Sequence, residues 1–323
     1  MPVLVGLLAL AAQPAYAQQT RKSKTQPTIA RKAASVRARA VSTPKVVEDL
    51  NVPRYKVDAS GDLVPDLRAA AAIIYNPQTN QVLWEENSQD QRSIASITKV
   101  MTATVFLENN PDLSQEVTIA RSDVYAASTT KLILNDKVTA DDLLHLLLIA
   151  SDNAAARALA RVSPLGSVGF VERMNQKALE LGLTSTHYAD PSGLLSDNVS
   201  SAYDMARLIA HASADDRIGS IMRTQEYSIQ TKRRGFTFKS TDHLLGRTDI
   251  DVRAAKTGFI SKSGYCLATL LRLPQGGQEV AVVVLGARSN AGRFMETENL
   301  FNWLSAKAST IFATQTAVPV QQD

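Results

Sequence analysis

Apolar and polar positions along this 323-residue chain form two hairpin patterns, one in its first third and one in its last third. Residues 71–75 and 81–84 are mostly apolar and flank a turn-rich Asn-Pro-Gln-Thr-Asn segment, which predicts a first pair of strands. Residues 265–271 and 280–285 are apolar on either side of Pro-Gln-Gly-Gly and predict a second pair. Strands are therefore expected on both sides of the centre of the chain.

The centre of the chain has the periodicity of helices. Residues 97–107 are apolar enough for a largely buried helix with Ser96 in its first turn. Thr139 and Asp142 have the spacing of a capping box ahead of a leucine-rich stretch, and a run of alanines follows it. A last helix is expected around residues 300–304. Strand sets at both ends of a helical centre predict an α+β fold, in which helices, including a helical subdomain, flank one antiparallel β-sheet.

The N-terminal segment has the features of a secretory signal peptide. Residues 3–12 form an apolar core that is too short to span a bilayer, and Ala15-Tyr16-Ala17 has the pattern of a cleavage site. The missing basic residue before this core is a departure from the usual signal, which a start further upstream would explain. We therefore divide the chain into a signal peptide at 1–17, a basic disordered segment at 18–50, a folded domain at 51–308 and a flexible C-terminal tail at 309–323.

Positive charge is concentrated in residues 18–47. This segment holds eight of the 35 lysines and arginines and has no acidic or aromatic residue, which is the composition of a disordered segment. The remaining 27 basic residues face 31 acidic ones, so the rest of the chain carries about −4 although the whole chain carries +4. The basic character therefore belongs to a solvated spacer, and it does not indicate a nucleic-acid-binding domain.

Cysteine and histidine give no sign of a disulfide, a catalytic thiol or a metal site. Cys266 is the only cysteine and lies in an apolar strand pattern, so no intramolecular disulfide can form and no cationic surroundings activate the thiol. The four histidines have none of the usual metal-ligand spacings. We expect neither a metal nor another cofactor.

The candidate chemistry lies in three short motifs, of which the first is Ser96-Ile97-Thr98-Lys99. Residues three apart lie on one face of a helix, so the Ser96 hydroxyl and the Lys99 amine can touch. Burial favours the neutral form of an amine, which can then accept the proton of a serine and make it a nucleophile. Considered alone, the pattern has an alternative explanation, an N-cap serine followed by a surface lysine.

The other two motifs are polar interruptions of apolar stretches. Ser151-Asp152-Asn153 lies between two predicted helices, where polar groups bind either the local backbone or a ligand. Lys256-Thr257-Gly258 opens the strand pattern of the second hairpin. Its lysine and threonine can hold a substrate carboxylate, and its glycine lets a substrate backbone approach closely. A solvated strand end is the alternative explanation.

In this order and at these intervals, the three motifs resemble those of penicillin-binding proteins and class A β-lactamases. The chain is most similar to the low-molecular-mass penicillin-binding proteins, the serine D-alanyl-D-alanine peptidases, and among these to the periplasmic D-alanyl-D-alanine endopeptidases. The resemblance implies a serine β-lactamase / D,D-peptidase-like fold and covers roughly residues 65–305. Beyond the motifs it is carried by the segments 170–175, Leu181-Gly182, 190–194, 201–206, Thr241-Asp242-His243-Leu244 and Gly264-Tyr265-Cys266-Leu267.

The resemblance also implies a role for each motif residue. Ser96 is the acylated nucleophile and Lys99 is the proton acceptor. Ser151 relays a proton toward the leaving group, and Asn153 binds Lys99 or the substrate amide.

The third motif and its neighbour are implied to bind the substrate. Lys256 and Thr257 hold its carboxylate beside Gly258. The backbone N–H groups of Ser96 and Phe259 form the oxyanion hole.

Three functions remain open from the sequence. The favoured one is a serine D,D-peptidase that cleaves D-alanyl cross-links of peptidoglycan as an endopeptidase, and its near alternative is a carboxypeptidase that trims pentapeptides. A β-lactamase needs a deacylating base, but residues 172–175, Glu-Arg-Met-Asn, are one residue short of an E-x-x-x-N pattern. The third function is that of a non-catalytic wall-binding protein. The intact Ser96–Lys99 pair argues against it, because such a protein has no need of that pair.

The favoured function implies partners and a location. The partners are peptidoglycan stem peptides, with β-lactams as covalent inhibitors, and no nucleic acid is expected. The predicted signal peptide places the protein in the periplasm. No stable membrane anchor is expected, because no other long apolar segment follows the signal.

Overall fold

The computed structural model describes residues 52–274 and 277–316, with side chains up to residue 308. The predicted signal peptide, the basic segment at 18–50 and residues 317–323 lie outside the described residues. The helix α8 (Asn290–Thr316) continues past the domain boundary that the sequence suggested at residue 308. In the part of the chain that the structure describes, no helix is both long and apolar enough to cross a membrane.

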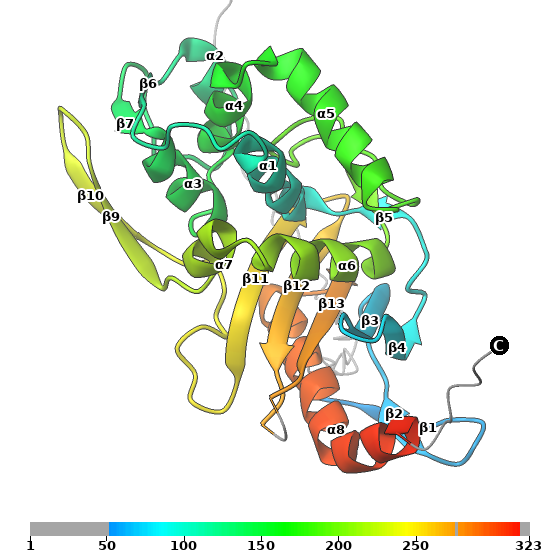
Figure 1. The fold of residues 1–323 in the computed structure, drawn as a ribbon. Coiled ribbons are helices and arrows are strands. Elements are labelled where there is room, and N and C mark those ends of the chain that lie inside the picture. The colour runs from blue at the N-terminus through cyan, green and yellow to red at the C-terminus, as the bar shows by residue number, and fades with distance from the viewer. Residues whose placement is uncertain (1–51, 275–276, 317–323) are drawn as a thin grey trace, which may run out of the picture. The chain divides into compact units, whose positions relative to one another are not determined.

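A five-stranded antiparallel sheet lies at the centre of the domain (Figure 1). Its order is β11-β12-β13-β3-β4, so both predicted hairpins are present and join each other through β13 and β3. The third motif does not open its strand as expected, because residues 251–255 already pair with β12 ahead of it. The strand bounds are β3 (Ala71–Asn76), β4 (Gln81–Glu86), β11 (Asp251–Ile260), β12 (Gly264–Arg272) and β13 (Glu279–Ala287).

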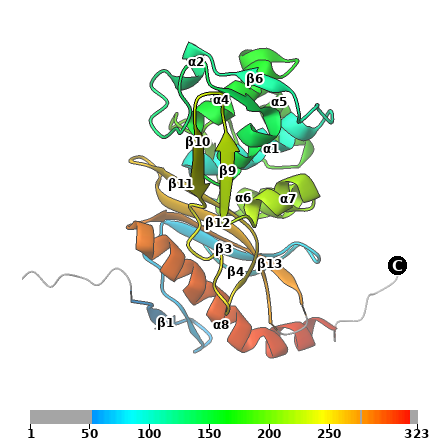
Figure 2. The ribbon, with the colours of Figure 1, turned by 90° about the vertical axis from the view of Figure 1, so that its left-hand side faces the viewer.

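Helices cover both faces of this sheet (Figures 1 and 2). The helix α8 packs on one face, and α6 (Ala202–Ser213) packs on the other. Alternate residues of β13 face the two sides, so Val283 belongs to the core on the α6 side and Val282 to the core on the α8 side. A strand buried on both faces has a continuous apolar run instead of an alternating one, which explains the sequence of β13.

The remaining helices form a helical part above the α6 face. The predicted capping box is confirmed, since the Asp142 N–H donates to the Thr139 Oγ1 at 3.0 Å and the Thr139 N–H donates to Asp142 Oδ2 at 3.1 Å. The helices are α1 (Thr98–Leu107), α2 (Arg121–Val124), α3 (Ala140–Leu148), α4 (Asn153–Val162), α5 (Gly166–Glu180) and α7 (Asp216–Met222).

Four short two-stranded ladders complete the described part. One of them, the β9–β10 hairpin, projects from the domain beside the helical part (Figure 1). The strands are β1 (Tyr55–Val57) with β2 (Leu63–Pro65), β5 (Arg92–Ser93) with β8 (Val199–Ser200), β6 (Glu116–Thr118) with β7 (Lys137–Thr139), and β9 (Glu226–Gln230) with β10 (Gly235–Lys239).

Candidate active site

Ser96 lies in a short 3₁₀ turn, η1 (Ala95–Ile97), between β5 and α1. The α-helix begins at Thr98, so Ser96 precedes it, where the sequence suggested the first helical turn. Ala95 has a left-handed φ of +48°, which turns the chain sharply just before the serine. Lys99 follows in the first turn of α1.

Two glycines let neighbouring segments pack against this turn. A Cβ on Gly193 would lie 2.0 Å from the Ala95 carbonyl oxygen, and a Cβ on Gly258 would lie 2.6 Å from the Ile94 carbonyl oxygen. No real Cβ comes so close to an oxygen, so only glycine fits at either position. The structure therefore gives Gly258 a close neighbour in the protein's own η1 turn, and the approach of a substrate backbone at this glycine stays a prediction.

The Lys99 side chain is completely buried, and its Nζ contacts three oxygen atoms. It lies 2.9 Å from Ser96 Oγ, 2.6 Å from Asn153 Oδ1 and 2.5 Å from the Ser192 carbonyl oxygen. The Asn153 Nδ2 donates to the Ala127 carbonyl at 2.8 Å, which fixes the amide with Oδ1 toward Lys99. The amide and carbonyl oxygens can only accept. A neutral Lys99 therefore donates its two N–H bonds to them and keeps its lone pair for the Ser96 hydroxyl.

The electrostatic surroundings of Lys99 suit a base. Burial lowers the pKa of Lys99 from 10.5 to about 7, against the opposing effect of the Asp152 and Asp190 carboxylates. The Arg157 guanidinium adds a smaller lowering of the same pKa. An amine with a pKa near neutrality is substantially deprotonated at pH 7, so it can accept a proton in the reaction.

The second motif lies at the junction between α3 and α4. Ser151 has a left-handed φ of +58°, and Asp152 is the N-cap residue of α4. The Asp152 carboxylate also accepts the Lys131 backbone N–H at 2.5 Å. Both explanations that the sequence left open are therefore present: Asp152 holds the local backbone, whereas Ser151 and Asn153 face a cleft.

Lys256 is buried behind Ser151 and does not line the cleft as an open clamp. Its Nζ donates to Ser151 Oγ at 2.8 Å and to the Thr257 carbonyl oxygen at 3.0 Å. Burial lowers the pKa of Lys256 well below 10.5, and the neighbouring Lys99 lowers it further. Two amines so close disfavour each other's charged form, which helps to keep one of them neutral.

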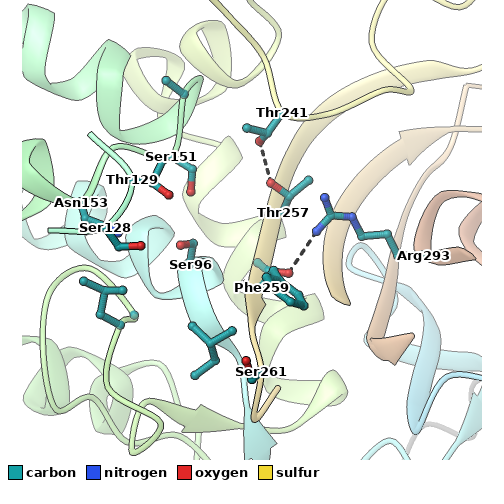
Figure 3. Close-up of a pocket in the computed structure, with 15 residues that line it drawn as sticks. Ser96, Ser128, Thr129, Ser151, Asn153, Thr241, Thr257, Phe259, Ser261 and Arg293 are labelled. Carbon is teal, nitrogen blue, oxygen red and sulfur yellow. Dashed lines mark hydrogen bonds between the residues drawn. The ribbon is translucent and has the colours of Figure 1, made fainter. Parts of the chain in front are cut away.

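The motif residues meet at a cleft of about 430 Å³ between the helical part and β11 (Figure 3). Ser96 lies between the two walls of the cleft. One wall includes Ser128, Thr129, Ser151 and Asn153, and the other includes Thr241, Thr257, Phe259 and Arg293. Of the eight residues predicted from the sequence, six line the cleft, and Lys99 and Lys256 lie directly behind it.

Arg293 and Thr241 are among the cleft residues that the sequence reasoning did not predict. Arg293, near the start of α8, donates through Nη1 to the Gly258 carbonyl at 3.0 Å and to the Cys266 carbonyl at 3.2 Å. Burial lowers the pKa of Arg293 to about 10, so it is still a cation at neutral pH. The Thr241 hydroxyl lies 2.6 Å from the Thr257 hydroxyl. Thr241 was noted only as part of a family segment, and no local pattern marks Arg293.

Asp190 organises the loop that carries the Ser192 carbonyl. Its Oδ1 accepts the backbone N–H groups of Ser192 at 2.6 Å and Gly193 at 2.8 Å, and its Oδ2 accepts the Leu195 N–H at 2.7 Å. Burial opposes the charge, but these hydrogen bonds outweigh it and lower the pKa of Asp190. One carboxylate thus fixes the loop that contacts both η1 and Lys99.

Neither a metal cluster nor the cysteine belongs to this arrangement. Within 52–274 and 277–308, no group of three or more His, Cys, Asp or Glu side chains is placed to hold a metal ion. Cys266 is buried in β12, and this burial raises the pKa of its thiol.

Comparison with known proteins covers most of the domain. Residues 58–289 match the peptidase S11 family, described as D-alanyl-D-alanine carboxypeptidase. The D-alanyl-D-alanine endopeptidase of Escherichia coli (strain K12) is 32% identical over 244 residues, which cover 74% of this chain and 78% of that protein. The D-alanyl-D-alanine endopeptidase of Pseudomonas aeruginosa is 31% identical over 266 residues, which cover 81% of this chain and 85% of that protein.

A solved structure of a D,D-transpeptidase has a similar fold. The Streptomyces K15 DD-transpeptidase matches with a TM-score of 0.70 and 30% identity, over 75% of this chain and 98% of that chain. This likeness confirms the predicted fold class. The family match confirms the resemblance noted from the motifs. The chain therefore belongs to the peptidase S11 family and is a serine-type D-alanyl-D-alanine peptidase.

Proposed function

We propose that this peptidase cleaves the D-alanyl cross-links of peptidoglycan through an acyl-enzyme on Ser96. The observation that carries the proposal is the 2.9 Å contact between Ser96 Oγ and the buried amine of Lys99, whose pKa is lowered to about 7. Neutral Lys99 takes the serine proton while Oγ attacks the carbonyl carbon of the D-alanyl bond. The backbone N–H groups of Ser96 and Phe259 stabilise the resulting oxyanion.

Ser151 completes the acylation step. Its Oγ accepts a hydrogen bond from Lys256, so its own hydroxyl proton is free to point into the cleft. The proton that Lys99 gained reaches the leaving amine with Ser151 as relay, and the C–N bond breaks. Water then attacks the ester carbon while Lys99 accepts one of its protons. The bond between that carbon and Ser96 Oγ breaks, Lys99 returns the proton to Oγ, and the acid product leaves.

The free carboxylate of the substrate needs a cation or hydroxyl on the cleft wall. Thr257 and Arg293 both line that wall, and Arg293 is the one charged side chain among the described residues that line the cleft. We assign the carboxylate to these two groups. Lys256 supports them from behind, because a bound anion favours its protonated form.

A cross-link and a terminal D-alanine offer the same chemistry to this site. In both, the scissile bond follows a D-alanyl residue and the leaving residue carries a free carboxylate. The endopeptidase assignment rests on the relatives named D-alanyl-D-alanine endopeptidase, at 31–33% identity, while relatives named carboxypeptidase match at 29–32%. Carboxypeptidase action on pentapeptides is the alternative.

The deciding experiment offers purified cross-linked peptide dimers and monomeric pentapeptides at equal concentration. We expect loss of dimers with the native protein and no loss with Ser96→Ala. Release of free D-alanine from the pentapeptide without loss of dimers would establish the carboxypeptidase instead.

The same site is expected to react with penicillin and to release it slowly. No Asp or Glu lines the cleft within the described residues, so a carboxylate base for fast deacylation is missing there. This favours β-lactams as covalent inhibitors over a β-lactamase activity. A penicillin adduct on the peptide that contains Ser96, found by mass spectrometry, tests the assignment, and an adduct that persists in Ser96→Ala contradicts it.

We place this activity in the periplasm. The support is the apolar core at residues 3–12 and the Ala15-Tyr16-Ala17 site, which lie outside the described residues. Fractionation of cells that make the full chain tests this, since the mature protein should begin at Gln18 in the periplasmic fraction.

A further inference from the structure

Five basic side chains gather around the tip of the β9–β10 hairpin. They come from the hairpin turn and from the segment between α2 and α3 against which the turn packs. We call this group the basic rim: Lys131, Lys137, Lys232, Arg233 and Arg234.

The basic rim adjoins the active-site cleft. Thr129 lines the cleft, and Lys131 follows two residues later, so their Cα atoms lie within about 7 Å. The Arg234 guanidinium donates to the Lys131 carbonyl, and the Arg233 Nη1 donates to the Leu134 carbonyl at 3.4 Å. The hairpin tip is thus held against the chain that forms one wall of the cleft.

Two carboxylates in the described part of the chain form ion pairs with these cations. Glu116 is 2.6 Å from Lys137 and 3.7 Å from Lys232, and Asp136 is 3.5 Å from Arg234. Among the described residues, no carboxylate lies within ion-pair distance of the two remaining cations, Lys131 and Arg233. Five cations against two carboxylates leave an excess of three positive charges at this place.

This local excess runs against the composition of the domain. Outside residues 18–47, the chain carries about −4. The Lys232 side chain is 68% exposed, and Lys131 and Arg233 are also exposed, so their charges face solvent. A concentrated field beside a cleft attracts an anionic partner and steers it toward the cleft.

We propose that the basic rim binds carboxylates of the peptidoglycan network next to the peptide that is being cut. This rests on the proposed function, because stem peptides of an assembled network carry many carboxylates on one covalent scaffold. Binding a second part of the same polymer raises the effective concentration of the peptide at the cleft. The rim therefore favours assembled peptidoglycan over soluble fragments. Continuity with the substrate cleft favours this partner over an anionic lipid surface.

The test compares the native protein with the double variant Lys131→Gln/Arg233→Gln. Neither side chain contacts the catalytic groups, and the Lys131 backbone bond to Asp152 is preserved. At about 50 mM salt we expect roughly five- to tenfold weaker co-sedimentation with purified sacculi, and at about 500 mM salt the difference should vanish. Acylation by penicillin and cleavage of soluble dimers should stay within about twofold, since surface charges act little on buried groups in salt.

The matched control is Lys56→Gln/Lys307→Gln, which removes one exposed and one half-buried charge at the opposite end of the domain, on β1 and α8 (Figure 1). It should sediment like the native protein. Equal binding by the native protein and the rim variant, or equal loss by the control, overturns the proposal. Preferential binding of the native protein to phosphatidylglycerol vesicles over sacculi, lost in the rim variant, makes the partner a membrane. Binding is measured separately from cleavage. Native protein that binds sacculi without opening cross-links therefore contradicts the proposed function but not the proposal that the basic rim binds peptidoglycan.

Discussion

The rate of acylation is expected to follow the neutral fraction of Lys99. Burial lowers the pKa of this lysine from 10.5 to about 7, and the neutral amine is the reactive form. At pH 7 about half of the protein then has a neutral Lys99, whereas an unperturbed lysine is neutral in only about one molecule in 3,000. Burial therefore raises the concentration of the base by roughly a thousandfold, which corresponds to about 4 kcal/mol.

The assay is the rate of acylation of Ser96 by a fluorescent penicillin between about pH 5.5 and pH 9. Below the midpoint the rate should fall about tenfold per pH unit, because the proton on Lys99 must first leave, and above about pH 8 it should level off. Lys99→Arg should lose at least about a thousandfold at every pH, since a guanidinium keeps its proton. Lys256→Arg is the matched control, because it keeps a hydrogen-bond donor beside Ser151, and it should retain part of the rate. A rate that is flat from pH 5.5 to 9, or a Lys99→Arg variant that acylates like the native protein, would refute the reasoning.

Three other predictions follow from the site. Arg293→Gln should raise KM for substrates with a free terminal carboxylate by roughly tenfold, as one lost charge-assisted hydrogen bond implies, and it should weaken acylation by penicillin as well, because penicillin also carries a free carboxylate; equal KM values for native and variant protein contradict the role. Gly193→Ala should lower the melting temperature clearly, because its Cβ would lie 2.0 Å from the Ala95 carbonyl oxygen, and Gly169→Ala on α5, whose Cβ would meet only the Leu165 Cβ at 3.4 Å, should change it little. Asp190→Asn should move the midpoint of the pH–rate profile to lower pH, because the Asp190 carboxylate raises the pKa of Lys99; a midpoint that stays or rises contradicts it.

Local sequence patterns predicted most of the architecture. Both hairpins were visible because their strands are short apolar runs on either side of turn residues, and the Thr139–Asp142 capping box was visible because its two bonds join residues three apart. The start of β11 was missed, since residues 251–255, Asp-Val-Arg-Ala-Ala, form no apolar run, and they form strand by pairing with β12. Pairing between distant segments overrides local propensity in such a strand.

The candidate site, too, was predictable where its contacts join residues close in sequence and not where they join distant ones. Ser96 and Lys99 are three residues apart, so a helical model alone brings them together. The position of Lys256 behind Ser151, and that of Arg293 on the cleft wall, depend on contacts across 105 and 35 residues, which no local pattern encodes. The sequence indicated that another segment lies close to Gly258, but only the folded structure shows that this segment includes the η1 turn.

The carboxylates around the two buried amines explain why Lys99 has a pKa suited to its task. Asp152 and Asp190 raise the pKa of Lys99 without touching its Nζ, whose three contacts are neutral oxygens. A direct ion pair would stabilise the ammonium and restore the high pKa of a surface lysine, which ends its use as a base. Burial without any nearby carboxylate would lower the pKa further and weaken the base when it must hold the serine proton. Carboxylates held one layer away, by helix capping at Asp152 and by loop backbone at Asp190, give a pKa between these limits.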